Sequence, residues 1–212
     1  MTFLAFTRRA LVGGLAALAA AAFAPASAQE DFSAEAEAYV QAALDEVIGA
    51  LSIGDEAEKR KRLRELVEKY IDTQRVALST LGNYRRQATR EQLREFIPLF
   101  KDYAIGQYEE QIVNYSGERF AVTGSIVRSS RVVIVNSEVS GGEYDGTIVQ
   151  WSVYKRDGEL SVIDIGAENI WLGVEQRSQF TSFIADNGGA PAGIDKLIED
   201  LRKRVAERDT DA

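Results

Sequence analysis

One carboxylate stands out because of the sequence that surrounds it. Asp164 lies within the apolar stretch of residues 160–165, Leu-Ser-Val-Ile-Asp-Ile, which is typical of a half-buried strand. A carboxylate that is taken out of water needs a partner, and Arg177 is the candidate that follows it in the chain. Such a pair can be an acid that catalyses a reaction or binds a polar ligand, or it can be a structural clamp between a strand and a helix. The pattern favours the clamp.

Several kinds of catalytic and metal-binding site are excluded by composition. The chain has no histidine and no cysteine, so it cannot build a Ser-His-Asp triad, a Cys-His nucleophile or a zinc site with His and Cys ligands. Its 33 Asp and Glu residues leave carboxylate chemistry open, since a pair of carboxylates can hydrolyse a glycosidic bond. No spacing in the sequence singles out such a pair. We expect no metal ion and no cofactor and name no catalytic residue, but carboxylate chemistry stays open at this point.

The N-terminus has the three parts of a signal peptide, which we assign to residues 1–28. Arg8 and Arg9 form a positively charged start, residues 11–23 are mostly apolar, and residues 26–28 are an Ala-Ser-Ala cleavage site. The apolar run is too short to cross a membrane. We expect export followed by cleavage, through the general secretory route or through the twin-arginine route that the paired arginines also fit.

The mature chain is long enough for one domain with a sizeable core, which we assign to residues 29–212, with a disordered tail from about residue 208. Removal of residues 1–28 takes away two arginines and no acid, so the net charge changes from −8 to −10. A negative charge of this size argues against nucleic-acid binding and against electrostatic adsorption to anionic lipid.

Apolar periodicity predicts helices first and a sheet afterwards. Helices are expected to start at the capping residues Ser33, Asp55, Asp72 and Thr89, the last with Gln92 at capping-box spacing. Four strands and then two helices are expected at residues 120–126, 131–138, 145–156, 159–166, 170–187 and 194–207. A run of helices followed by an antiparallel sheet predicts an α+β domain.

The last two strands are expected to form a hairpin. The pair Asp157-Gly158 is a strong signal for a two-residue turn, because both central positions tolerate a positive φ. If these residues form the turn, Val153 lies opposite Val162 and Trp151 lies opposite Asp164. Asp164 is therefore predicted to share the sheet face of Trp151.

An ordered set of motifs extends from Leu81 to Phe120. Its residues are Leu81, Gly82, Tyr84, Arg86, Ala88, Thr89, Glu91, Gln92, Phe96, Phe100, Tyr103, Tyr115, Gly117, Glu118 and Phe120. A second motif, Arg-Ser-Gln-Phe at residues 177–180, precedes a Gly-Gly pair and a helix with Leu-Ile. This set resembles the MlaC/toluene-tolerance family of periplasmic phospholipid-binding proteins, over nearly the whole chain after about residue 31.

The resemblance implies a fold and a function. The fold would be helices wrapped around a four-stranded curved antiparallel sheet, similar to the NTF2-like cone, with an internal lipid cavity. The function would be that of a soluble periplasmic phospholipid carrier, and not of an enzyme. Such a carrier shuttles lipid between an outer-membrane lipoprotein complex and an inner-membrane ABC transporter with its lipid-binding subunit, and so maintains outer-membrane lipid asymmetry.

Large apolar residues at helical or strand spacing are, from the sequence alone, most typical of a packed core. The resemblance implies instead that they line a cavity for acyl chains. We predict that the lipid-binding residues are Phe96, Phe100, Tyr103, Ala104, Tyr108, Val149, Trp151, Trp171 and Phe180, with Asp164 and Arg177 as a structural clamp.

The sequence also departs from the family pattern. Trp171 stands where the family tends to have a small residue, which leaves the number of acyl chains and the lipid class open, hopanoid lipids included. Two other functions stay open as well. One is an exported enzyme on a cone-like scaffold that uses Asp164 or Glu168, and the other is an envelope module that binds proteins.

Overall fold

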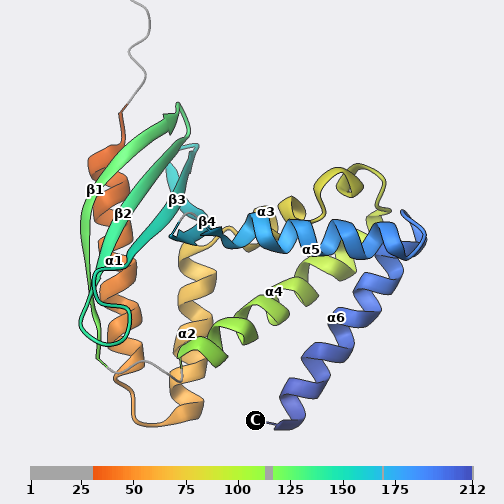
Figure 1. Ribbon diagram of the computed structural model, residues 1–212, viewed down its shortest axis with the longest axis horizontal. Coiled ribbons are helices and arrows are strands. Elements are labelled where there is room, and N and C mark those ends of the chain that lie inside the picture. Colours follow the sequence, from red (N-terminus) through yellow and green to blue (C-terminus); the bar gives the residue numbers. More distant parts are fainter. Residues whose placement is uncertain (1–30, 113–116, 169, 212) are drawn as a thin grey trace, which may run out of the picture.

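The computed structural model describes residues 31–112, 117–168 and 170–211, without the side chains of residues 108–112 and 209–211. The predicted signal peptide, residues 1–28, lies outside the described residues. Figure 1 shows the sheet with helix α1 on one side of the molecule and helices α4, α5 and α6 extending to the other, with α2 between them.

The first three helices begin close to the predicted positions. They are α1 (Ser33–Leu51), α2 (Glu56–Tyr70) and α3 (Thr73–Thr80). Asp55 caps α2 by accepting a hydrogen bond from Glu58 N at 2.8 Å, and Asp72 caps α3 by accepting one from Arg75 N at 2.9 Å. Each cap satisfies a backbone donor that has no partner within its own helix.

A short 3-10 helix, η1 (Gly82–Arg86), leads into the long helix α4 (Arg90–Ile112). The predicted capping box is present at the start of α4. Gln92 N donates to Thr89 Oγ1 at 3.1 Å, and Thr89 N donates to Gln92 Oε1 at 3.0 Å. The same Gln92 side chain also donates to Asp195 Oδ1 at 2.6 Å, so the box additionally ties α4 to the last helix.

The sheet is antiparallel and its strands follow one another in chain order. It consists of β1 (Arg119–Ser129), β2 (Val132–Ser140), β3 (Ile148–Arg156), β4 (Glu159–Ala167) and the two-residue β5 (Ile170–Trp171). The turn from β3 to β4 has positive φ angles at Asp157 and Gly158, as predicted. The α+β class is confirmed, with β5 as one strand more than the sequence predicted.

Two helices close the chain, α5 (Leu172–Asp186) and α6 (Ala192–Asp211). Helix α6 continues to Asp211, where the sequence predicted a disordered tail from about residue 208. Within the described residues, no helix is both long and apolar enough to span a bilayer.

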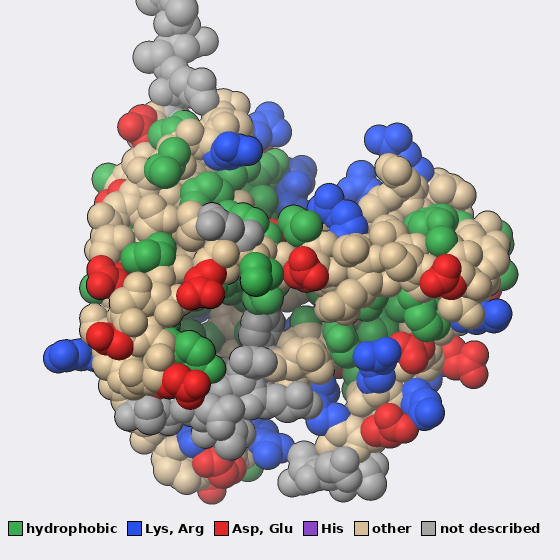
Figure 2. All heavy atoms as spheres, viewed as in Figure 1, with side chains coloured by type: hydrophobic (Ala, Val, Ile, Leu, Met, Phe, Trp, Pro, Cys, Tyr) green, Lys and Arg blue, Asp and Glu red, His purple; other side chains and the backbone are tan. Residues whose placement is uncertain are grey.

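The buried apolar residues form three clusters. The aromatic cluster joins α3, α4, α5 and α6, and it contains Ala77, Leu81, Phe96, Phe100, Tyr103, Phe180, Ile184, Ile194, Leu197, Ile198 and Leu201. A second cluster packs α1 against β2 and β3, and a third packs α1 against α2. The sheet and α1 therefore form one half of the molecule and the four later helices form the other, and Figure 2 shows the surface hollowed between them.

Candidate functional site

An apolar cavity lies between α1, α2 and the sheet, beside the place where α4 passes. Its volume is about 160 Å³. It is lined by Ala43, Leu44, Val47, Leu63, Leu66, Val67, Tyr70, Ile71, Ile105, Trp151, Val162 and Ile165. The lining side chains are hydrocarbon apart from one phenol and one indole, so the space suits an apolar ligand and not a charged one.

Helical spacing explains how α1 and α2 reach the cavity. On α2 the lining residues Leu63, Leu66, Val67 and Tyr70 recur at intervals of three and four, which places them on one face of the helix. The α1 residues on the opposite wall include the small Ala43. A short side chain at this position leaves space that its neighbours do not fill.

Trp151 is fixed on the sheet side of the cavity by hydrogen bonds. Its indole Nε1 donates to Ser137 Oγ at 2.9 Å, and this buried hydroxyl donates onward to the carbonyl of Val149 at 3.4 Å. The strand partner of Trp151 is Ile165, which also lines the cavity. The polar atom of the indole is thus satisfied within the sheet, and the ring contributes apolar surface to the cavity.

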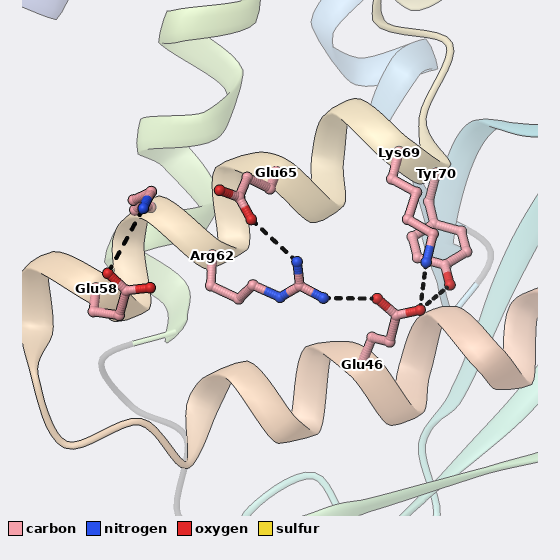
Figure 3. A network of polar contacts seen from close by, with 7 residues as sticks. Glu46, Glu58, Arg62, Glu65, Lys69 and Tyr70 are labelled. Carbon is pink, nitrogen blue, oxygen red and sulfur yellow. Dashed lines mark hydrogen bonds and ion pairs between the residues drawn. The ribbon is translucent and has the colours of Figure 1, made fainter.

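A polar network lies beside Tyr70 and joins α1 to α2 (Figure 3). Glu46 Oε1 accepts hydrogen bonds from Tyr70 Oη at 2.8 Å and from Lys69 Nζ at 2.5 Å, while Glu46 Oε2 accepts one from Arg62 Nη2 at 3.0 Å. The hydrogen bonds from Lys69 and Tyr70 lower the pKa of Glu46, so its carboxylate stays charged. Burial and the bond to Glu46 raise the pKa of Tyr70.

Tyr39 strengthens the same junction from α1. Its hydroxyl donates to the backbone carbonyl of Tyr70 at 3.2 Å, and the two rings meet edge to face with centroids 5.2 Å apart. Burial raises the pKa of Tyr39 to about 12. The phenol therefore stays protonated and keeps donating at physiological pH.

The other flank of α2 is tied to α4. Arg64 Nη1 pairs with Asp102 Oδ1 at 3.1 Å, and Lys101 of α4 pairs with Glu68 of α2. At its end α2 is joined to the sheet, because Asp72 N donates to the carbonyl of Val162 at 3.0 Å. Helix α2 is thus one wall of the cavity, joined to the sheet at its C-terminal end, packed on α1 through buried apolar residues and tied to α1 and α4 by partly exposed ion pairs.

Most of the predicted lipid-binding residues lie away from this cavity. Phe96, Phe100, Tyr103 and Phe180 pack against one another in the aromatic cluster, with ring centroids 5.8–6.2 Å apart, and Ala104 packs against them. Such tilted and edge-to-face arrangements are typical of a filled core. None of these five residues is among those that line the cavity.

The remaining predicted residues divide as follows. Trp151 lines the cavity. Val149 is half-buried in β3 opposite Ser137 and Ala167, and Trp171 lies against Gly166, where an added Cβ would be 3.0 Å from the indole. Neither of these two lines the cavity. The side chain of Tyr108 lies outside the described part of the structure.

The predicted direct ion pair between Asp164 and Arg177 is not formed. Asp164 Oδ1 accepts hydrogen bonds from Ile165 N and Gly173 N, each at 2.9 Å, whereas Arg177 Nε donates to the carbonyl of Ser79 at 2.8 Å. Both residues still join α5 to other elements, Asp164 from β4 and Arg177 to α3. Burial raises the pKa of Asp164, and the two backbone donors and the charge of Arg177 oppose that shift.

A β-bulge explains why Asp164 lies elsewhere than predicted. Val153 is paired with Val162 as expected, but Asp164 is paired with Ser152 and Trp151 with Ile165. The extra residue in β4 is Ile163, and it moves Asp164 to the face opposite Trp151. Asp164 is therefore directed at the start of α5 and not into the cavity.

The cavity residues on α1 and α2 carry a signal in the sequence, because their apolar spacing predicts inward faces. That spacing does not separate a residue that touches a filled core from one that borders a gap. Among the described residues there is no group of three or more acidic side chains placed to hold a metal ion.

Comparison with known proteins places these features in a family. The model of the family described as "MlaC protein" matches residues 38–203. The toluene tolerance protein Ttg2D of Pseudomonas putida is 24% identical over 175 residues, which cover 79% of this chain and 80% of that protein. A phospholipid-binding protein from Ralstonia solanacearum, solved in complex with a phospholipid, has the same fold. It matches with a TM-score of 0.69 and 24% identity, over 82% of this chain and 98% of that one. Because the family model matches most of its length, this chain belongs to the MlaC family.

Proposed function

We propose that this protein is a periplasmic phospholipid carrier and that the cavity between α1, α2 and the sheet receives an acyl chain. The observation that carries the proposal is an apolar cavity in a member of the MlaC family, whose fold matches a phospholipid-binding protein. Each methylene that leaves water gains roughly 0.8 kcal/mol, whether it enters a bilayer or a dry cavity. Transfer between the two is then nearly neutral, and no catalytic residue is needed.

The size of the cavity has a consequence for loading. A dry cavity of roughly 150 Å³ accepts a molecule the size of benzene, so about 160 Å³ holds only a short part of an acyl chain. The walls must therefore separate for the rest of the lipid to enter. We take α2 as the wall that moves, because its partly exposed ion pairs to α1 and α4 add little stability, which leaves its apolar contact with α1 as the main interaction to be opened.

The partners and the compartment follow from the same proposal. The carrier takes lipid from an outer-membrane lipoprotein complex or delivers it there, and exchanges it with an inner-membrane ABC transporter and its lipid-binding subunit. This exchange would maintain the lipid asymmetry of the outer membrane. Export through the signal peptide, residues 1–28, would place the protein in the periplasm between these partners. The headgroup would remain in water at the mouth of the cavity.

Native mass spectrometry of the protein purified from its host without detergent tests the proposal. We expect a co-purifying lipid at low stoichiometry, and uptake of lipid from vesicles after delipidation. The mass of the lipid distinguishes a glycerophospholipid from a hopanoid. Protein that never contains lipid and takes none up from vesicles would refute the carrier function.

A further inference from the structure

We propose that the cavity also binds single-ring aromatic hydrocarbons, with benzene as the simplest member, as a class of ligand separate from lipids. The first argument is volume. The cavity measures about 160 Å³, close to the roughly 150 Å³ at which a dry apolar cavity in a protein binds benzene.

The second argument is the chemistry of the lining. The two polar side-chain atoms on the lining residues already have protein partners, Nε1 of Trp151 on Ser137 and Oη of Tyr70 on Glu46. A ligand therefore meets apolar surface and needs no hydrogen-bonding group. Water inside it finds few hydrogen-bond partners, which favours entry of a small hydrocarbon.

The third argument concerns selectivity within this class. Trp151 and Tyr70 approach the cavity from different elements, β3 and α2. Aromatic rings prefer offset or edge-to-face contact with other aromatic rings, beyond the gain from burial. The pair therefore favours benzene over cyclohexane, which has the same number of carbons but no π-system.

The fourth argument separates this ligand from lipid in mechanism. A single ring fits the cavity as it stands, so α2 does not need to move. An acyl chain that enters the cavity would occupy the same space, and the two ligands would exclude each other. This competition rests on the proposed lipid function, whereas the binding of the ring rests on the cavity alone.

The experiment measures benzene and cyclohexane binding to delipidated mature protein by calorimetry in a sealed cell. The cavity is filled in one variant, Ala43→Leu. The matched control is Ala42→Leu, the same change at the neighbouring position of α1, where the side chain is exposed. We expect one benzene per protein and weaker binding of cyclohexane. Binding should fall by about tenfold or more in Ala43→Leu and be unchanged in Ala42→Leu.

The outcomes separate the two proposals. Benzene binding that is equal in Ala43→Leu and Ala42→Leu would place the ligand elsewhere and overturn the inference. The absence of benzene binding in a protein that still takes up phospholipid would also overturn it, and would leave the carrier function intact. Benzene binding that persists in protein that takes up no lipid would sustain the inference while the carrier function fails.

Discussion

The aromatic cluster of α3–α6 and the cavity beside the sheet are both apolar, but the first is filled and the second is hollow. In the aromatic cluster, Phe96, Phe100 and Phe180 contact one another pairwise through their rings. The cavity is bounded by a few residues from each of α1, α2, α4, β3 and β4, and their side chains leave the space between them unfilled. Ion pairs at the surface tie the helices of both regions, Arg62–Glu46 beside the cavity and Arg202–Glu95 between α4 and α6 beside the aromatic cluster.

Large apolar side chains at helical spacing did not, as a group, mark the position of the cavity. A stripe of phenylalanines at helical spacing fills space efficiently, and a core at native density has no room for a second molecule. Space remains where residues from several elements meet and a small one, Ala43, stands among them. The cavity is therefore a property of the assembled elements.

The largest expected effect is a loss of stability from a substitution in the aromatic cluster. Phe96→Ala removes a fully buried ring and should lower the free energy of unfolding by about 3–5 kcal/mol. The lipid content of the protein that remains folded should be unchanged. Urea unfolding followed by circular dichroism, together with lipid analysis, measures both. A stable Phe96→Ala protein without lipid would mean that the aromatic cluster is the ligand site.

A matched pair of filling substitutions sharpens the comparison. Ala77→Leu places three more carbons into the packed aromatic cluster and should cost about 1–3 kcal/mol through overpacking. Ala43→Leu directs the same carbons into the cavity and should cost less than about 1 kcal/mol. Only Ala43→Leu should reduce lipid uptake from vesicles. Equal losses of stability in both variants would contradict the presence of a cavity at Ala43.

A substitution between the cavity wall α2 and α1 is expected to have a smaller effect, on the rate of lipid release. Glu46→Gln removes the charge that binds Lys69 and Arg62 across the α1–α2 junction, so release of bound lipid should become faster, by less than about tenfold. The control is Glu65→Gln, because Glu65 pairs with the same Arg62 within α2 and joins no second helix. Release is followed with a fluorescent phospholipid and acceptor vesicles. Equal rates in the two variants would argue against α2 as the moving wall.

The smallest expected effect is a pH dependence at Asp164. Burial raises the pKa of this carboxyl in the folded state, so the folded protein binds its proton more tightly than the unfolded chain does. The contribution of Asp164 to stability is therefore present at low pH and is lost as the pH rises through the raised pKa. Asp164→Asn keeps an acceptor for Ile165 N and Gly173 N but cannot ionise.

The test for Asp164 compares unfolding free energies of the two proteins across acidic pH. The free energy of unfolding of Asp164→Asn should increase relative to that of the native protein as the pH rises through the raised pKa of Asp164. Above that pKa the difference between the two proteins should stay constant. The pKa of Glu46 is lowered in both proteins, so the contribution of Glu46 cancels when their unfolding free energies are subtracted. A difference that moves in favour of the native protein with rising pH would contradict the raised pKa.

Local signals in the sequence predicted much of the fold. The caps at Asp55 and Asp72, the box of Thr89 with Gln92, and the turn at Asp157-Gly158 all form as expected. Each depends on a few neighbouring residues, so its spacing can be read directly. The order of helical and strand periodicity predicted the α+β class, and the family resemblance implied the same class.

The candidate site was harder to predict because it depends on distant residues. A single extra residue, Ile163, moves Asp164 to the other face of the sheet, and nothing in the local pattern marks that bulge. The apolar spacing of α2 predicts that Leu63 and Leu66 face inward, but not that they border a gap. A gap depends on the fit of several elements to one another, which a one-dimensional pattern does not contain.

The most direct test of the central claim is to map where a bound acyl chain lies. The mature protein would be loaded with a phospholipid that carries a photoreactive diazirine near the end of one acyl chain, irradiated and digested. The labelled residues would then be identified by mass spectrometry. We predict adducts on the cavity residues of α1, α2 and β3, such as Val47, Leu63 and Trp151. Adducts on Phe96, Phe100 and Phe180 instead would show that the aromatic cluster opens to receive lipid, and would contradict the account.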